Sequence, residues 1–139
     1  MTSTAPLPVK VDDPILVVED DTLLREALGR ALQLIGRTTA MAADGGEAIA
    51  WLKSTRPSLV LLDLSIPVVG GEAVATALRS SYGDRIPIIV MSAGADASVV
   101  ADRLGAWEYL RKPFDLAELL DMVQHALRDT APTARCSGS

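Results

Sequence analysis

Short apolar runs alternate with longer segments of helical periodicity along most of this chain. This alternation limits the number of folds that the chain can adopt. Runs such as Ile-Leu-Val-Val at 15–18 and Leu-Val-Leu-Leu at 59–62 suit strands that are covered on both faces. Strands that alternate with helices favour one parallel sheet, because each helix carries the chain back to the same end of the sheet. The sequence therefore predicts five strands, over residues 15–18, 38–42, 59–62, 86–91 and 107–110.

A helical segment follows each predicted strand. Residues 22–35 repeat apolar side chains at the spacing of one helical face. Asp44 and Glu47 form a capping-box-like start to the second helix. The remaining helices are predicted at about 71–79, at about 97–104 and from Asp115 onward. Five βα units without a reversal predict a flavodoxin-like, doubly wound α/β domain around a central five-stranded parallel sheet.

The chain of 139 residues suffices for one domain, which we place at residues 13–129. Residues 1–12 and 130–139 hold too few apolar side chains for a second core, so we expect a flexible lead-in, a flexible tail and no output domain. A net charge of −5 argues against direct nucleic-acid binding, which depends on neutralising phosphates.

The sequence argues against a membrane-spanning or secreted protein and against a disulfide or zinc site. No apolar run reaches the roughly 20 residues that span a bilayer, and the first residues lack a signal-peptide pattern. A lone cysteine, Cys136, and a lone histidine, His125, offer neither an internal disulfide nor a zinc site. We expect a cytoplasmic protein with no membrane contact.

Polar side chains stand where the apolar runs end. Glu19 and Asp20 follow the first run, Asp63 the third, Ser92 the fourth and Lys112 the fifth. Parallel strands bring their carboxyl ends to one edge of the sheet, where open α/β sheets bind ligands. Carboxylates, a hydroxyl and an ammonium that converge there suit a metal ion together with a phosphoryl group.

This constellation resembles the receiver domain of bacterial two-component response regulators over almost the whole chain, from Pro14 to Arg128. The family pattern is an acidic pair after strand one, an aspartate ending strand three, a Ser or Thr ending strand four, and Lys-Pro after strand five. Secondary markers also match, namely Pro67 and Gly71 after the aspartate, Ala93 after Ser92, and Tyr109 before Lys112.

The resemblance implies that Asp63 is the nucleophile that takes a phosphoryl group from a phosphohistidine of a sensor histidine kinase or phosphotransfer protein. It implies Mg²⁺ as cofactor, held by Asp20, Asp63 and the backbone carbonyl of Ser65, with Glu19 acting through a metal-bound water. Close carboxylates repel, so their proton affinity is expected to rise without the metal.

Further roles follow from the same resemblance. Lys112, Ser92 and Ala93 would bind the phosphoryl oxygens, and the bond before Pro113 is expected to be cis. Phosphorylation would draw Ser92 inward and let Tyr109 rotate, which changes the surface of the last strand and its neighbouring helices. A homodimer through that surface is a further expectation.

Some residues suggest other roles or depart from the family pattern. Asp21 is expected to cap the first helix rather than to bind metal. Ser92 and Lys112 lie twenty positions apart, about two fewer than is usual, so the fourth helix or its loop should be shortened. Trp107, expected to be exposed, replaces a commonly acidic residue, which disfavours a charge-paired dimer. Small residues at Ser65 and Gly94 predict a site open to water.

The expected function is that of a stand-alone receiver that signals through protein contacts and acts on no metabolite. One alternative is a binding module that keeps the fold without using phosphorylation. A second is an aspartyl-phosphate phosphatase of the haloacid-dehalogenase class, which requires an aspartate two residues after its nucleophile, where this chain has Ser65. A flavodoxin relative is disfavoured because no phosphate-binding loop follows the first strand.

Overall fold

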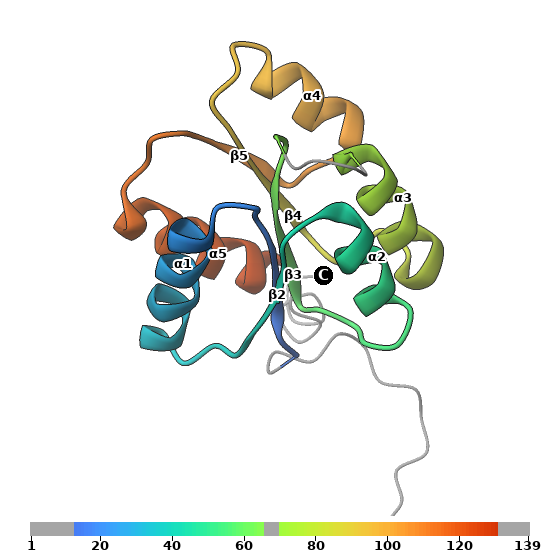
Figure 1. The fold of residues 1–139 in the computed structure, drawn as a ribbon, viewed down its shortest axis with the longest axis horizontal. Helices are drawn as coiled ribbons and strands as arrows, with labels where there is room; N and C mark the ends of the chain where they lie inside the picture. Colours follow the sequence, from blue (N-terminus) through green and yellow to red (C-terminus); the bar gives the residue numbers. More distant parts are fainter. Residues whose placement is uncertain (1–12, 66–69, 131–139) are drawn as a thin grey trace, which may run out of the picture.

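A computed structural model describes residues 13–65 and 70–130, which form a five-stranded parallel sheet with helices on both faces (Figure 1). The strands lie in the order β2-β1-β3-β4-β5. The strands are β1 (Ile15–Val18), β2 (Thr39–Ala42), β3 (Leu59–Asp63), β4 (Ile88–Ser92) and β5 (Glu108–Arg111). The helices are α1 (Thr22–Leu34), α2 (Gly45–Leu52), α3 (Gly71–Tyr82), α4 (Ala97–Leu104) and α5 (Leu116–Thr130). The predicted flavodoxin-like (βα)₅ fold is confirmed.

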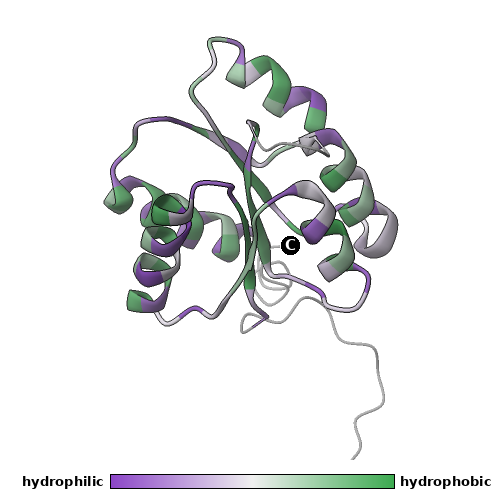
Figure 2. Cartoon of the chain, viewed as in Figure 1, coloured by the Kyte–Doolittle hydropathy of each residue, from purple (hydrophilic) through white to green (hydrophobic). Residues whose placement is uncertain are grey.

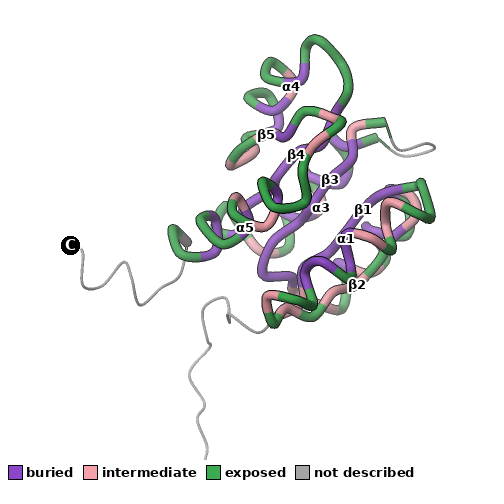
Figure 3. Tube along the Cα trace, turned by 90° about the vertical axis from the view of Figure 1, so that its left-hand side faces the viewer, coloured by how far each residue is buried: buried purple, intermediate pink, exposed green. Residues whose placement is uncertain are grey.

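Strand residues alternate between two apolar layers. Helices α1 and α5 cover one face of the sheet, and α2 and α3, with α4 beyond them, cover the other (Figure 1). Ile15 and Val17 point into the first layer, whereas Leu16 and Val18 point into the second. Strand β1 is therefore apolar throughout, and β3 and β4 are apolar up to their last residue, whereas the edge strand β5 carries exposed Glu108 and Arg111. The helices mix polar and apolar residues (Figure 2). The tube coloured by exposure shows the central strands β1, β3 and β4 buried and the helix faces exposed outside (Figure 3).

Side-chain caps fix the starts of α1 and α2. The Asp21 carboxylate accepts hydrogen bonds from the N–H groups of Leu23 at 2.9 Å and Leu24 at 3.2 Å, which confirms its predicted capping role. At α2, the Glu47 N–H donates to Asp44 Oδ1 at 2.8 Å. The Glu47 carboxylate reaches back to the N–H of Ala43 at 2.7 Å, one residue earlier than in the standard capping box.

The region from α4 to β5 differs from one expectation. Helix α4 has eight residues and buries Ala97, Ala101 and Leu104 before it ends at Gly105, whose φ is 70°. The expectation that Trp107 is exposed is wrong, because its side chain is half-buried against the apolar layer under α1 and α5. Its N–H donates to the carbonyl of Ile88 at 2.8 Å, so the ladder holds it at the sheet edge, where the indole covers apolar neighbours.

Some predicted features fall on residues that the structure does not describe. The predicted lead-in at 1–12, Pro67, Cys136 and the tail beyond residue 130 are outside them. Within residues 13–65 and 70–130, the structure contains no helix of the length and apolar character that crossing a bilayer requires. The assigned strands differ from the predicted ones by up to two residues at their starts and by up to one residue at their ends, as expected for boundaries set by ladder hydrogen bonds.

Two leucines test how much the sheet interior contributes to stability. Leu61 in β3 is 0% exposed, whereas Leu34 at the end of α1 is 83% exposed. We expect Leu61→Ala to lower the free energy of unfolding by about 2–5 kcal/mol, because it removes buried methyl groups and leaves a cavity. Leu34→Ala should change it by no more than about 0.5 kcal/mol in the same urea titration. Similar losses in both variants would contradict this assignment of the core.

Candidate functional site

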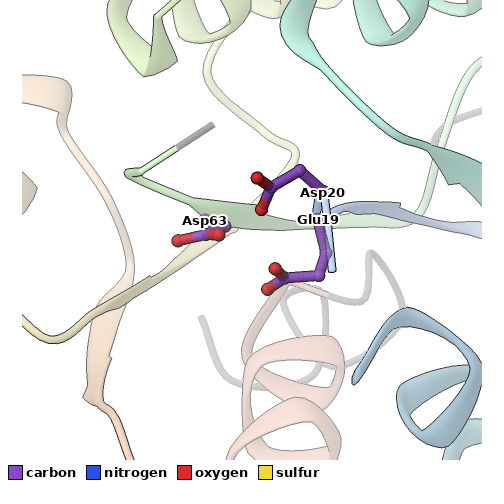
Figure 4. Close-up of side chains that lie close together, drawn as sticks. All are labelled: Glu19, Asp20 and Asp63. Atoms are coloured by element: carbon purple, nitrogen blue, oxygen red, sulfur yellow. The ribbon is translucent and has the colours of Figure 1, made fainter. Parts of the chain in front are cut away.

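Three carboxylates meet at the carboxyl ends of β1 and β3 (Figure 4). Glu19 and Asp20 follow β1, and Asp63 is the last residue of β3. The two strands pair in parallel with Val18 opposite Leu62, so the residues that follow are neighbours. One oxygen from each carboxylate lies within 4.8 Å of the others. The chain turns to β2 on one side of β1 and to β3 on the other, which places the cluster where doubly wound sheets bind ligands.

The carboxylates differ in their contact with solvent. Glu19 and Asp63 are 0% and 1% exposed, whereas Asp20 is exposed. The site is therefore closed on its inner side and open at Asp20.

The donor set fits a magnesium ion. Octahedral Mg²⁺ with oxygens at about 2.1 Å spaces adjacent ligands roughly 3 Å apart and opposite ligands about 4.2 Å apart. Carboxylate oxygens within 4.8 Å of one another can reach those spacings by small side-chain rotations. The predicted ligands Asp20 and Asp63 are thus brought together, with Glu19 beside them. The role of the Ser65 carbonyl stays a prediction.

The Lys112 ammonium joins this cluster from the end of β5. Its Nζ lies 3.2 Å from Glu19 Oε1 and 3.3 Å from Asp63 Oδ2. Its backbone N–H donates to the carbonyl of Ser92 at 2.9 Å, and the peptide bond to Pro113 is cis, as expected. Burial alone lowers the pKa of Lys112, but the charges of Asp63 and Glu19 outweigh it and raise that pKa. The side chain is therefore a permanent cation.

Burial dominates the protonation of Glu19. Removal from water, together with the nearby Asp63 charge, raises the pKa of Glu19 to about 7, although the N–H of Asp21 and the Lys112 ammonium oppose this shift. The Asp21 N–H donates to Glu19 Oε2 at 3.1 Å. The expected rise in proton affinity is confirmed for Glu19, but desolvation contributes more to it than carboxylate repulsion does.

Ser65 contacts Asp63 through groups that the sequence prediction did not use. Its N–H donates to Asp63 Oδ1 at 3.1 Å, and its hydroxyl lies 3.0 Å from both carboxylate oxygens. Serine two residues after an aspartate commonly bonds it locally, so the spacing itself is the signal that could have indicated this contact.

Ser92 ends β4 on the other side of Asp63 and is 9% exposed. Its hydroxyl oxygen accepts a hydrogen bond from the N–H of Gly94 at 3.0 Å, which the sequence did not reveal. Ser65, Ser92, Ala93, Gly94 and Lys112 line one cleft together with residues of α3 and α4. The structure therefore gathers the predicted phosphoryl-binding residues at the same opening.

Tyr109 lies farther from the carboxylates. It is half-buried on β5, opposite Val90, and packs against the apolar layer under α2, α3 and α4. Ser92 is two residues farther along β4 and is opposite Arg111. Tyr109 therefore lies on the strand next to the one that carries Ser92, two positions before the residue opposite Ser92. The rotation of its side chain stays a prediction.

Comparison with known proteins points to one family. The family model for the response regulator receiver domain matches residues 15–124. The transcriptional regulatory protein PrrA of Mycobacterium tuberculosis is 42% identical over 125 residues, which cover 88% of this chain and 53% of PrrA. Response regulator MprA of Mycolicibacterium vanbaalenii is 43% identical over 120 residues, which cover 85% of this chain and 52% of MprA.

Solved structures agree with this match. The receiver domain of the sensor histidine kinase PA1611 from Pseudomonas aeruginosa, which has a magnesium ion in its active-site cleft, superposes with a TM-score of 0.75 at 29% identity. That match covers 84% of this chain and 98% of the PA1611 domain. A CheY-like receiver domain from Methanospirillum hungatei gives a TM-score of 0.78 at 24% identity over 86% of this chain and 96% of its own, which supports the fold.

The chain spans about half the length of the curated relatives it matches. The expectations of a stand-alone role, a cytoplasmic location and no metabolite substrate therefore stay predictions.

The raised pKa of Glu19 predicts a pH dependence of stability. Glu19 titrates near 4.5 in the unfolded chain and near 7 in the folded protein, so between these values the folded state binds more protons. Stability should therefore fall as pH rises from about 4.5 through 7, by on the order of 3 kcal/mol.

Urea unfolding across this pH range, in buffer with a metal chelator, measures the slope. Glu19→Gln should remove this part of the slope, while Glu118→Gln, which alters an exposed glutamate on α5, should keep it. An unchanged slope in Glu19→Gln would contradict the assignment.

Proposed function

This chain belongs to the response regulator receiver domain family, and we propose that it is a phosphoacceptor switch in which Asp63 receives a phosphoryl group from a sensor histidine kinase or phosphotransfer protein. The observation that carries the proposal is the position of the Asp63 carboxylate. It is 1% exposed, lies 3.3 Å from the Lys112 ammonium and shares a cluster with Glu19 and Asp20. A carboxylate so placed is a nucleophile beside a fixed positive charge.

In the proposed transfer, an Asp63 oxygen attacks phosphorus, and the bond from phosphorus to the histidine nitrogen breaks. The leaving imidazole takes the bond electrons and then a proton. Lys112 is placed to bind a phosphoryl oxygen, because its ammonium already lies at hydrogen-bond distance from Asp63. The Ser92 hydroxyl accepts from Gly94 and keeps its own hydrogen for a second phosphoryl oxygen.

Mg²⁺ held by Asp20, Asp63 and the Ser65 carbonyl, with Glu19 acting through water, would supply positive charge that reduces repulsion between the carboxylates and the incoming phosphoryl group. Support for the carboxylate ligands comes from their spacing, and support for the choice of metal comes from the magnesium ion in the PA1611 domain. Lys112 alone leaves a local excess of negative charge, because it faces two buried carboxylates.

The proposed readout links Ser92 to Tyr109. Drawing the Ser92 hydroxyl toward the phosphoryl group frees space near the end of β4, and Tyr109 on β5 is the neighbouring half-buried aromatic side chain. Its movement would change the α4–β5–α5 face, which we propose is presented to a downstream protein. A homodimer through that face stays a prediction. Acceptance and loss of the phosphoryl group are the only reactions we propose.

Phosphorylation by a small acyl-phosphate donor tests the proposed acceptor. With Mg²⁺ present, the native chain should incorporate phosphate, and Asp63→Asn should incorporate none, because an amide is a poor nucleophile. Asp21→Asn is the matched control, since Asp21 is exposed, caps α1 and should tolerate the same change. Equal labelling of the native chain and Asp63→Asn would contradict the proposal and favour a binding module that does not use phosphorylation.

The small side chains beside Asp63 predict a short phosphoryl lifetime. Ser65 is exposed and Gly94 has no side chain, so water can reach the phosphoryl group. We expect the isolated phosphorylated protein to lose its phosphoryl label well before many hours have passed. The Ser65→Gln variant should lengthen the lifetime of the phosphoryl group several-fold. The measurement is label remaining after donor removal, and a lifetime of many hours in the native chain would contradict the prediction.

A further inference from the structure

Arg25, the fourth residue of α1, reaches back to the carboxylate cluster, where its hydrogen bond is with a backbone carbonyl rather than a carboxylate. Its Nη1 donates to the backbone carbonyl oxygen of Glu19 at 2.6 Å. Arg25 is half-buried, and Glu19 is fully buried. No step of the proposed phosphotransfer uses this guanidinium, so the contact needs a separate explanation.

The contact acts on the backbone that carries Asp20. The carbonyl of Glu19 belongs to the peptide plane that ends at the Cα of Asp20, and a planar peptide moves as one unit. Fixing that oxygen therefore restricts where the Asp20 side chain begins. Asp20 is itself exposed and has little packing to orient it, so its direction depends on this backbone.

Neighbouring contacts hold the rest of the turn, and within residues 13–65 and 70–130 the Arg25 guanidinium is the side-chain donor to this peptide's carbonyl oxygen. The Glu19 N–H donates to Ala42 at 3.0 Å, and the Asp21 N–H donates to the Glu19 side chain at 3.1 Å. The Arg25 N–H donates to the Asp21 carbonyl at 2.9 Å within α1. Arg25 thus contacts the turn at both ends of Asp20, through its backbone and its guanidinium.

A direct electrostatic effect of Arg25 on the Glu19 carboxylate is less consistent with the geometry of the site. The groups that shift the pKa of Glu19 are Asp21, Asp63 and Lys112, besides burial, and Arg25 is not among them. Its guanidinium acts on the peptide, where a charged donor forms a strong hydrogen bond.

We propose that Arg25 is a positioning residue that orients the Glu19–Asp20 peptide, so that Asp20 can join Asp63 on one divalent cation. This inference rests on the proposed function, because it concerns the same metal site. It assigns to α1 a part in metal affinity that is separate from its packing against the sheet.

The test compares Arg25→Gln and Arg25→Lys with Arg30→Gln. Arg30 is the matched control, because its side chain on the same helix is 78% exposed and lies 4.0 Å from Glu26. Calorimetric titration with Mg²⁺ alone gives the dissociation constant, and thermal unfolding in chelator reports stability. Acyl-phosphate labelling at several Mg²⁺ concentrations gives the half-saturating concentration.

We expect Arg25→Gln to raise both the Mg²⁺ dissociation constant and the half-saturating concentration by about three- to tenfold, with a near-native labelling rate at saturating Mg²⁺. Arg25→Lys should recover part of the affinity, because an ammonium can still donate to the carbonyl. Arg30→Gln should match the native chain.

A lower unfolding temperature with native Mg²⁺ affinity in Arg25→Gln would overturn the proposal and leave Arg25 a structural role only. If Arg25→Gln does not fold, native Mg²⁺ affinity in Arg25→Lys overturns it and a weakened affinity supports it. Failure of the proposed function can be told apart from failure of this inference. In the first case the native chain itself takes no label, while the Mg²⁺ titrations still compare the variants.

Discussion

The Lys112 ammonium lies between two carboxylates that have almost no contact with water, 3.2 Å from Glu19 and 3.3 Å from Asp63. Buried carboxylates destabilise a fold unless a charge or hydrogen-bond donor compensates them. Lys112 supplies the charge here, while the Asp21 N–H donates to Glu19 and the Ser65 N–H and hydroxyl donate to Asp63. The compensation is incomplete, because burial and Asp63 still raise the pKa of Glu19 to about 7. A site that retains excess negative charge is suited to a divalent cation, which links the electrostatics of the fold to the proposed chemistry.

Topology explains why these groups meet. In the strand order β2-β1-β3-β4-β5, the chain runs from β1 to β2 on one side and then crosses to β3 on the other side of β1. The acidic residues after β1 therefore face the end of β3. Lys112 follows β5, two strands away from β3, and its long side chain spans the distance across the end of β4. The same β4 end carries Ser92, opposite Arg111 of β5, and the proposed coupling of Asp63 to Tyr109 passes through this strand pair.

Much of this arrangement was predictable from sequence, because apolar runs of strand length are followed by polar residues in register with one sheet edge. Asp20, Asp63, Ser92 and Lys112 were placed correctly on that basis, and Asp21 was recognised as a cap from its position before a helix. Contacts that depend on three-dimensional direction were not predictable. The Gly94 N–H and the Arg25 guanidinium each act through a backbone geometry that residue identity does not encode, whereas the contact of Ser65 with Asp63 could have been inferred from their spacing. Trp107 was misjudged because exposure at a strand start depends on packing across the edge, not on neighbouring residues in the chain.

Of the two carboxylates beside Lys112, Asp63 is the one that we propose becomes an acyl phosphate. Reductive trapping tests it on the unmodified sequence, because borohydride converts a phosphorylated aspartate to homoserine and peptide mapping then locates the converted residue. After reaction with an acyl-phosphate donor and Mg²⁺, we expect homoserine at position 63, and no conversion when the metal is chelated. Conversion at position 20 or 21 instead of 63, or none with Mg²⁺ present, would contradict it.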